Sequence, residues 1–258
     1  MNITKLYDFT NKTALITGAS QGLGKQIAIC LSCHGARVIL ASRNIEKLTE
    51  LKNNLGNAKA IRLDIADNTS VLKCFNELNS AGEKIDICIN NAGVLKPTPI
   101  FNLDSTVCFE NICNTNILGT WRVLQHVATH MKNNNIHGSI INISSAGADK
   151  ISRANVSGYY ASKAAIVKLT ANLVHELSPY NIRINTILPG TYLTKMTQHR
   201  FQTNSQIENT TTKIPLKRLG NPKDLDGIIL YLSSNNASAY VTGSCFTIDG
   251  GMSCLSID

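Results

Sequence analysis

The sequence predicts an α/β protein with a single domain, built as a doubly wound parallel sheet of about seven strands with helices on both faces. Apolar, β-branched runs of strand length recur along the 258 residues, and segments with helical spacing separate them, as is typical of βαβ units. The runs are nearly continuous in apolar residues, which indicates strands buried on both faces. We expect strands at residues 13–17, 38–41, 58–63, 85–90, 139–143, 182–187 and 245–248.

Composition limits the class of protein. Apolar residues make up 43% of the chain, which is enough for a sizeable core, and no run of membrane-spanning length lacks polar residues. Residues 1–8 have no apolar segment of a secretory signal, so we expect a cytoplasmic protein without a membrane partner. The net charge of +8 is spread along the chain among acidic residues, which argues against nucleic acid and favours small anionic ligands.

Eight cysteines are scattered through the apolar strand and helix segments, a distribution that predicts reduced, buried thiols rather than disulfides. The run from Cys30 to His34 matches the pattern for covalent haem attachment. It falls inside an apolar-periodic helix, so we interpret it as core packing and predict no haem or metal site.

A glycine-rich loop, Thr17-Gly18-Ala19-Ser20-Gln21-Gly22-Leu23-Gly24, directly follows the first expected strand. Glycines permit a tight turn and close backbone approach, and the N-terminus of the next helix offers free N–H groups to a pyrophosphate. A purely structural turn is the alternative. With a strand before it and a helix after it, the loop predicts a Rossmann-type dinucleotide site, with these contacts: Gly18, Ser20, Gln21, Gly22, Leu23 and Gly24.

The end of the second strand predicts which dinucleotide is bound. An acidic residue there would bind the adenosine ribose of NAD, whereas a nearby arginine accommodates the 2′-phosphate of NADP. Ser42 occupies the acidic position and Arg43 follows it. NADP(H) is therefore favoured over NAD(H), the alternative being that Arg43 is a solvated loop residue.

Tyr159 and Lys163 lie four residues apart at the start of an apolar-periodic helix, so they share a helix face, while Tyr160 should point elsewhere. A neighbouring ammonium favours the phenolate and lowers the pKa of a tyrosine. Lys163 could thus activate Tyr159 as the general acid or base that hydride transfer to a carbonyl requires. This spacing also arises by chance in many helices.

Further motifs, taken together, resemble the Tyr-dependent short-chain dehydrogenase/reductase family over residues 11–251. In addition to the glycine loop and the Tyr–Lys pair, they are Asn90-Asn91-Ala92-Gly93, Asn116, Ser144-Ser145 and Pro189-Gly190. The resemblance implies a catalytic set of Asn116, Ser145, Tyr159 and Lys163. Tyr159 would be the acid/base, Lys163 would hold the nicotinamide ribose, and Asn116 would support a proton-relaying water chain.

The resemblance leaves the catalytic serine open between two residues. The family donor is the second residue of such a pair, which gives Ser145, our choice. Its separation from Tyr159 is one residue longer than usual, however, and counting back from Gly147 selects Ser144.

More cofactor contacts follow from the same resemblance. Asp64 and Ile65 would meet the adenine, although a helix cap is the alternative for Asp64. The others are Asn91, Ala92, Gly93, Pro189, Gly190 and Thr194. The polar stretch 191–213 predicts a mobile flap over the substrate.

The implied substrate is a small carbonyl compound or alcohol. A 3-oxoacyl thioester, a sugar or polyol of the gluconate type, and another ketone all stay open. Reductases that act on acyl carrier protein carry arginines where this chain has Ile136-His137 and Tyr180, which weakens that reading. Residues 148–156, with Lys150 and Arg153, would border the pocket and hold a substrate carboxylate or phosphate, or be a solvated loop.

The resemblance further implies a homotetramer or homodimer, formed through the helix around residues 109–131 and the helix that begins at Tyr159. A non-catalytic NADP-binding regulatory protein is the alternative of another class. The intact set of four catalytic residues favours the enzyme.

Overall fold

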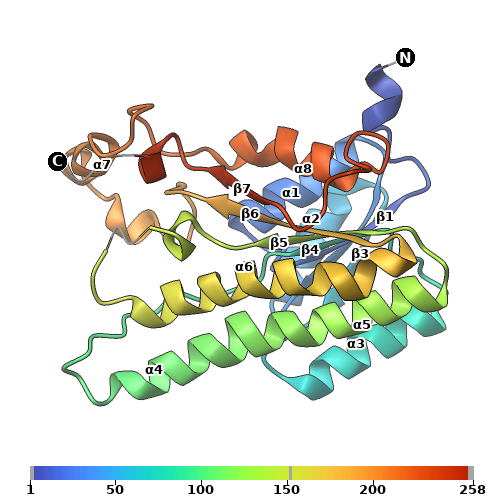
Figure 1. Cartoon of the computed structure of the whole chain (residues 1–258), viewed down its shortest axis with the longest axis horizontal. Coiled ribbons are helices and arrows are strands. Elements are labelled where there is room, and N and C mark those ends of the chain that lie inside the picture. Colours follow the sequence, from blue (N-terminus) through green and yellow to red (C-terminus); the bar gives the residue numbers. More distant parts are fainter. Residues whose placement is uncertain (1–2, 151–152, 255–258) are drawn as a thin grey trace.

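The computed structural model describes residues 3–150 and 153–254. They form one parallel sheet of seven strands in the order β3-β2-β1-β4-β5-β6-β7, with helices on both faces (Figure 1). The predicted fold class is confirmed, and each observed strand end lies within two residues of its prediction. The strands are β1 (Thr13–Thr17), β2 (Arg37–Ser42), β3 (Ala58–Arg62), β4 (Ile87–Asn90), β5 (Ser139–Ile143), β6 (Arg183–Pro189) and β7 (Cys245–Ile248).

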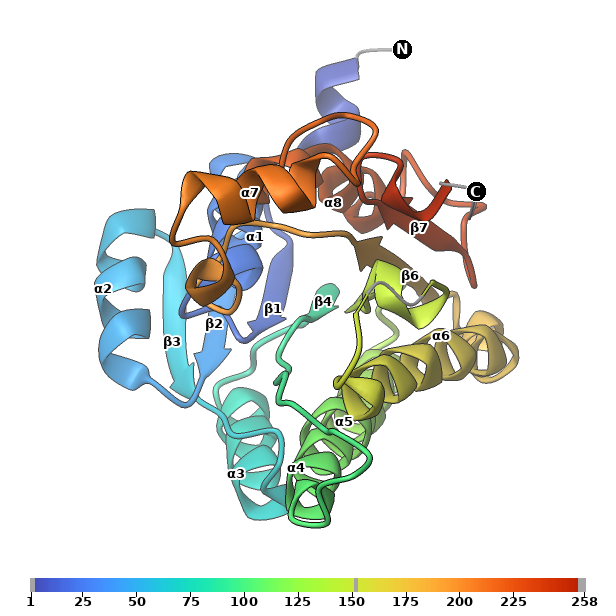
Figure 2. The ribbon, with the colours of Figure 1, turned by 90° about the vertical axis from the view of Figure 1, so that its left-hand side faces the viewer.

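Two helical layers sandwich the sheet (Figure 2). One layer holds α1 (Gly22–Cys33), α2 (Ile45–Leu55) and α8 (Asp226–Ser233). The other holds α3 (Asn68–Ser80), α5 (Thr120–Asn133) and α6 (Ser157–Leu177). Side chains alternate across each strand, so that Leu15 and Ile16 of β1 enter opposite cores.

The last strand departs from the predicted burial on both faces. Cys245 and Thr247 of β7 are exposed, whereas Phe246 and Ile248 pack against the core that includes α1 and α8. The cause is position: β7 is the edge strand, pairing only with β6. Residues 245–248 form an apolar run like those of the inner strands, so the sequence did not predict that β7 lies at the edge of the sheet.

The helix expected around residues 109–131 is a continuous run of three segments: α4 (Ser105–Ile112), a π-helical stretch (Cys113–Gly119) and α5. Asn116 lies in the π-helical stretch. Such single π turns inside longer helices occur frequently at functional sites.

The cysteines are free thiols, as predicted, but not all are buried. Cys30, Cys74 and Cys88 are buried, whereas Cys33, Cys245 and Cys254 are exposed. Cys30 packs in α1 and its carbonyl oxygen contacts His34 Nδ1 at 2.9 Å. Over the described residues, no group of three or more His, Cys, Asp or Glu is arranged to hold a metal ion.

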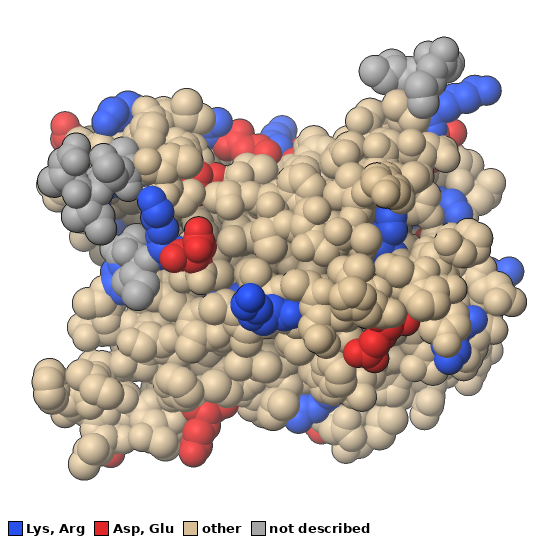
Figure 3. Space-filling view, viewed as in Figure 1, with Lys and Arg blue, Asp and Glu red and all other residues tan. Residues whose placement is uncertain are grey.

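Two further features bear on partners. Within residues 3–150 and 153–254, no helix is both long enough and apolar enough to cross a membrane. On the face shown in Figure 3, lysine and arginine side chains are scattered singly among acidic ones.

Candidate active site

The glycine-rich segment 17–24, which ends β1 and begins α1, has no room for side chains at two of its glycines. Gly18 has a φ of +68°, and a Cβ there would lie 2.9 Å from the Cα of Ala92. A Cβ on Gly24 would lie 2.4 Å from the carbonyl oxygen of Gly18. The loop backbone is therefore pressed against the segment that follows β4, which only glycine allows.

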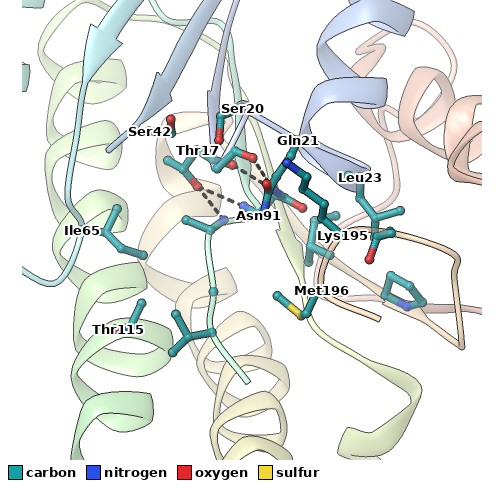
Figure 4. Close-up of a pocket in the computed structure, with 18 of the residues that line it drawn as sticks. Thr17, Ser20, Gln21, Leu23, Ser42, Ile65, Asn91, Thr115, Lys195 and Met196 are labelled. Carbon is teal, nitrogen blue, oxygen red and sulfur yellow. Dashed lines mark hydrogen bonds between the residues drawn. The ribbon is translucent and has the colours of Figure 1, made fainter. Parts of the chain in front are cut away.

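Hydrogen bonds lock that segment to the loop. The Thr17 hydroxyl accepts the backbone N–H groups of Asn91, at 3.0 Å, and Ala92, at 3.1 Å. The Asn91 amide donates back to the carbonyl oxygens of Thr17, at 3.0 Å, and Gly18, at 3.3 Å (Figure 4). Asn91, predicted as a cofactor contact, thus also fixes the shape of the glycine loop.

A cavity of about 430 Å³ opens beside this loop, next to the adjacent strands β1 and β4. This is the point at which the strand order reverses, where open α/β sheets bind ligands. Most of the predicted site residues line it: Gly18, Ser20, Gln21, Gly22, Leu23, Ser42, Arg43, Asp64, Ile65, Asn91, Ala92, Gly93, Ser145, Tyr159, Lys163, Pro189, Gly190 and Thr194. Two predicted residues, Gly24 and Asn116, do not line it and lie behind its wall.

The helix that follows the loop suits an anion. Its N-cap residue, Gln21, makes no side-chain capping bond, whereas the N-cap residues of α2 and α3 do. The first-turn N–H groups of α1 and the positive end of its dipole are thereby left to a ligand. Together with the glycine cradle, this fits the pyrophosphate of a dinucleotide.

The rim beside β2 is basic. The Ser42 hydroxyl accepts the backbone N–H of Asn44 at 3.2 Å, and Arg43 is exposed at the cavity edge. Lys47 of α2 and Lys195 from segment 191–213 also line the cavity, and Lys195 lies close enough to lower the pKa of Lys47. Sequence reasoning missed both lysines, although Lys195 directly follows Thr194.

Asp64 has two structural contacts as well as its place at the cavity. Its carboxylate accepts the N–H of Ala66 at 3.0 Å, and its own N–H donates to Ser70 Oγ at 2.9 Å. The cap of α3 is Asp67 instead. Asp64 therefore closes the turn before α3 without being its N-cap.

The two serines after β5 point in different directions. The Ser144 hydroxyl is 3% exposed and donates to the backbone carbonyl of Lys163 at 2.7 Å. The Ser145 hydroxyl accepts the N–H of Gly147 at 3.1 Å and lies near enough to the Tyr159 phenol to oppose the rise in its pKa. Extended backbone alternates side chains, so only Ser145 faces the tyrosine.

Tyr159 and Lys163 share the inner end of the cavity, but not in the way predicted. The Lys163 ammonium donates to the Ile143 carbonyl at 2.8 Å and lies 5.8 Å from the centre of the Tyr159 ring. Burial raises the pKa of Tyr159 to about 12, against the opposing effect of the nearby Ser145 hydroxyl. Burial also lowers the pKa of Lys163 to about 8. The expected lowering of the tyrosine pKa by Lys163 is absent, because desolvation dominates and Lys163 is not among the groups that shift this pKa.

Asn116 supports this group from behind. It is 1% exposed, and its amide donates to Ser162 Oγ at 2.9 Å and to the Val94 carbonyl at 3.0 Å. Ser162 in turn donates to the backbone carbonyl of Tyr159 at 2.7 Å. Asn116 thereby ties the segment after Gly93 to the first turns of α6.

Tyr160 was predicted to point away from the site. Its ring centre lies 6.0 Å from that of Tyr159, and it packs so tightly on Gly147 that a Cβ there would come within 2.2 Å of its Cε1. Adjacent helical residues diverge by about 100°, yet the loop after β5 wraps round to meet Tyr160. Tyr160 therefore does not line the cavity, as predicted, and packs against the loop after β5.

A glycine cradle at the switch point of a parallel sheet, with an acid/base tyrosine at its inner end, defines a nicotinamide-dinucleotide oxidoreductase of the Rossmann type. A family model described as enoyl-(acyl carrier protein) reductase matches residues 18–253. The chain belongs to the short-chain dehydrogenase/reductase family and acts on CH–OH groups, as the sequence motifs predicted.

Similar proteins cover nearly the whole chain. A D-arabinitol 2-dehydrogenase (ribulose-forming) from Scheffersomyces stipitis is 33% identical over 98% of this chain and 98% of its own. A 3-oxoacyl-(acyl-carrier-protein) reductase from Buchnera aphidicola is 34% identical over 94% of this chain and 98% of its own. The crystal structure of a gluconate 5-dehydrogenase from Burkholderia cenocepacia, in complex with NADP and tartrate, superposes with a TM-score of 0.91 at 28% identity, covering 98% of this chain and 99% of its own.

Proposed function

We propose that this protein is an NADP(H)-dependent oxidoreductase that interconverts a ketone and a secondary alcohol, with Tyr159 as the general acid/base. The observation that carries the proposal is that Ser145 and Tyr159, with Lys163, line the inner end of the same cavity. This arrangement brings two hydroxyl groups to one point, beside a cradle that fits a dinucleotide.

Each residue of the site has a part in this reaction. The bound dinucleotide supplies or accepts the hydride. Tyr159 donates a proton to the substrate oxygen during reduction and takes it back during oxidation, while Ser145 hydrogen-bonds the same oxygen. Lys163 uses one donor on Ile143, and an ammonium has three, so two are left for the nicotinamide ribose. Asn116 would relay protons through a water chain at its buried position.

Preference for NADP(H) rests on the charge around the end of β2. No acidic side chain occupies the position of Ser42, while Arg43, Lys47 and Lys195 line the same cavity. Arginine and lysine are suited to a phosphate. The gluconate 5-dehydrogenase of similar structure was crystallised with NADP, which supports the same preference.

Two substrate classes compete. A 3-oxoacyl thioester is supported by the reductase from Buchnera, and a sugar or polyol by the arabinitol and gluconate dehydrogenases. A 3-oxoacyl group attached to acyl carrier protein is less favoured as substrate, because Tyr180 stands where reductases of that kind carry an arginine. The Tyr180 ring lies on the surface, 4.5 Å from the Lys132 ammonium. A sugar, polyol or sugar acid is therefore our first choice of panel compound, with acyl-CoA thioesters second.

The flap and the assembly complete the proposal. Segment 191–213 carries α7 (Asn204–Thr211) and runs from β6 across toward α1 (Figure 2). Four of its residues line the cavity: Thr194, Lys195, Met196 and Thr197. We propose that this segment closes over the substrate.

A homodimer or homotetramer through α4–α5 and α6 would cover exposed apolar residues near α4: Ile100, Phe101, Leu103 and Val107. Light scattering after gel filtration tests the assembly.

The test of function follows NADPH consumption and NADP⁺ reduction with a panel of ketones, polyols, sugar acids and 3-oxoacyl-CoA thioesters. Tyr159→Phe is the matched blank, since it removes only the hydroxyl. We expect turnover by the wild type and a loss of about 10²- to 10⁴-fold in the variant, the usual worth of a general acid, with NADPH affinity retained. Tight NADPH binding without turnover of any compound would instead favour the non-catalytic regulatory protein.

A further inference from the structure

Two arginines lie close enough for the charge of one to act on the other, and neither lines the dinucleotide cavity. Arg153 belongs to the segment between a 3₁₀ turn (Ala146–Ala148) and α6, and Arg200 ends another 3₁₀ turn (Gln198–Arg200) within segment 191–213. The two segments follow the neighbouring strands β5 and β6. Burial, and then the nearby Arg153 guanidinium, lower the pKa of Arg200.

This pairing is unfavourable without an anion. Like charges repel, more strongly when partly buried than in water, and no carboxylate in the described part of the chain forms an ion pair with either arginine. Arg153 Nη1 is fully shielded from solvent and has no hydrogen-bond partner among the described residues. A buried donor left without an acceptor costs free energy and is rare in folded proteins.

Arg200 is held ready for a ligand. Its guanidinium lies 5.4 Å from the ring centre of Phe201, and Phe201 is itself 9% exposed. Contact with an aromatic ring restrains the planar guanidinium without using its N–H donors. The donors of both arginines are thus available to an acceptor placed between the two segments.

Tyr160 connects the arginine pair to the catalytic group. Its phenol interacts electrostatically with Arg200 on one side and with Tyr159 on the other, and its ring packs on Gly147, two residues after Ser145. Arg153, Tyr160 and Arg200 are all absent from the wall of the dinucleotide cavity. The pair is therefore separate from the glycine loop and from the basic rim around Arg43, and it is connected to Tyr159 through Tyr160.

We propose that Arg153 and Arg200 form an anion-binding subsite that holds a carboxylate or phosphate group of the substrate, several bonds from the carbon that exchanges hydride. The proposal rests on the function proposed above, and it names the substrate class: a hydroxy acid or a phosphorylated alcohol, preferred to a neutral polyol. Arginine forks suit both groups, because each offers two oxygens to paired N–H donors. Since Arg200 comes from segment 191–213, binding the anion would also draw this segment over the substrate.

The test compares paired substrates, one anionic and one neutral, such as D-gluconate and D-arabinitol, together with a sugar phosphate. The variants are Arg153→Gln, Arg200→Gln and the double variant, with Lys73→Gln on the exposed side of α3 as the charge-matched control. We expect kcat/KM for the acid or the phosphate ester to fall about 10- to 100-fold, as charge-assisted hydrogen bonds are lost. Of the acid and the phosphate ester, the one whose kcat/KM falls more shows whether the subsite binds a carboxylate or a phosphate. The neutral polyol makes no charge-assisted hydrogen bond to the arginines, so its turnover should change less than about threefold. Equal losses on both substrates, or no loss on either, would overturn the subsite.

A binding measurement separates this inference from the proposed function. With NADP⁺ saturating, D-gluconate or inorganic phosphate should raise the melting temperature of the wild type and not that of the double variant. Without an anion the double variant should melt at or above the wild-type temperature, because repulsion is relieved; a purely structural role would lower it. If no panel compound turns over but the anion-dependent stabilisation disappears in the variant, the subsite stands and the function fails. If polyols turn over and the variant keeps the anion effect, the function stands and the subsite fails.

Discussion

Ser144 and Lys163 are joined by a hydrogen bond of 2.7 Å from the serine hydroxyl to the lysine backbone carbonyl. This bond ties the end of β5 to the first turns of α6. It also turns the next side chain, Ser145, toward Tyr159. Adjacent serines of the same chemistry therefore have separate tasks, one bound to the backbone of α6 and one facing Tyr159.

Replacing each serine by alanine should separate these tasks. Ser145→Ala should lower kcat about 100-fold or more, the usual effect of losing one donor to the reacting oxygen, with little change in melting temperature. Ser144→Ala should cost about 1 kcal/mol of unfolding free energy, as for one buried hydrogen bond, and change kcat less. Steady-state kinetics and urea unfolding of both variants measure this; a greater kcat loss in Ser144→Ala would reverse the assignment.

The buried lysine should make stability depend on pH. The pKa of Lys163 is about 8 in the folded chain, against about 10.4 in the unfolded chain. Between these values the unfolded state binds more protons than the folded state. The free energy of unfolding therefore rises with pH across pH 8 to 10. Above pH 10 the raised pKa of Tyr159, about 12, acts oppositely and stability falls. Urea unfolding of the wild type and Lys163→Met from pH 7 to 10 checks the first effect. A constant difference between the two proteins would contradict it.

The glycine cradle should not tolerate a methyl group. In Gly24→Ala the new Cβ would lie 2.4 Å from both the Gly18 carbonyl oxygen and Asn91 Nδ2, so the loop must shift. We expect a cost of about 1–3 kcal/mol, as for other overpacked sites, and at least tenfold weaker NADP⁺ binding by fluorescence titration. Gly227→Ala in α8 is the control: its Cβ meets nothing within 4 Å, and alanine in a helix should stabilise slightly.

The basic rim should set the cofactor preference. Arg43→Asp and Ser42→Asp should each shift the ratio of kcat/KM for NADPH over NADH toward NADH, by about 10- to 100-fold. Arg43→Asp removes charge-assisted bonds to the 2′-phosphate, and both variants place a carboxylate that repels the phosphate and suits the ribose of NADH. Lys195→Gln should weaken NADPH more than NADH by a smaller factor, and Lys168→Gln on the exposed side of α6 should leave the ratio unchanged. An unchanged ratio in both Asp variants would show that NADP preference lies elsewhere.

Local patterns were sufficient to predict the strands and the glycine loop. A strand buried on both faces needs an apolar run, which is visible in the sequence. A loop backbone that packs directly against Ala92 needs a glycine, and glycine occupies position 18. The edge position of β7 and the exposure of Cys33 and Cys245 were not predictable, since they depend on which elements cover a segment, and no local pattern encodes this.

The sequence alone determined the class of fold, the dinucleotide loop and the spacing that brings Tyr159 and Lys163 to one helix face, because each is a property of residues close together in the chain. The tertiary structure decided which serine meets the tyrosine, that burial dominates the pKa of both Tyr159 and Lys163, and that Lys195 comes to the cavity from segment 191–213. These depend on desolvation and on contacts between distant segments, which arise only when β5, α6 and the chain after β6 are assembled on one sheet.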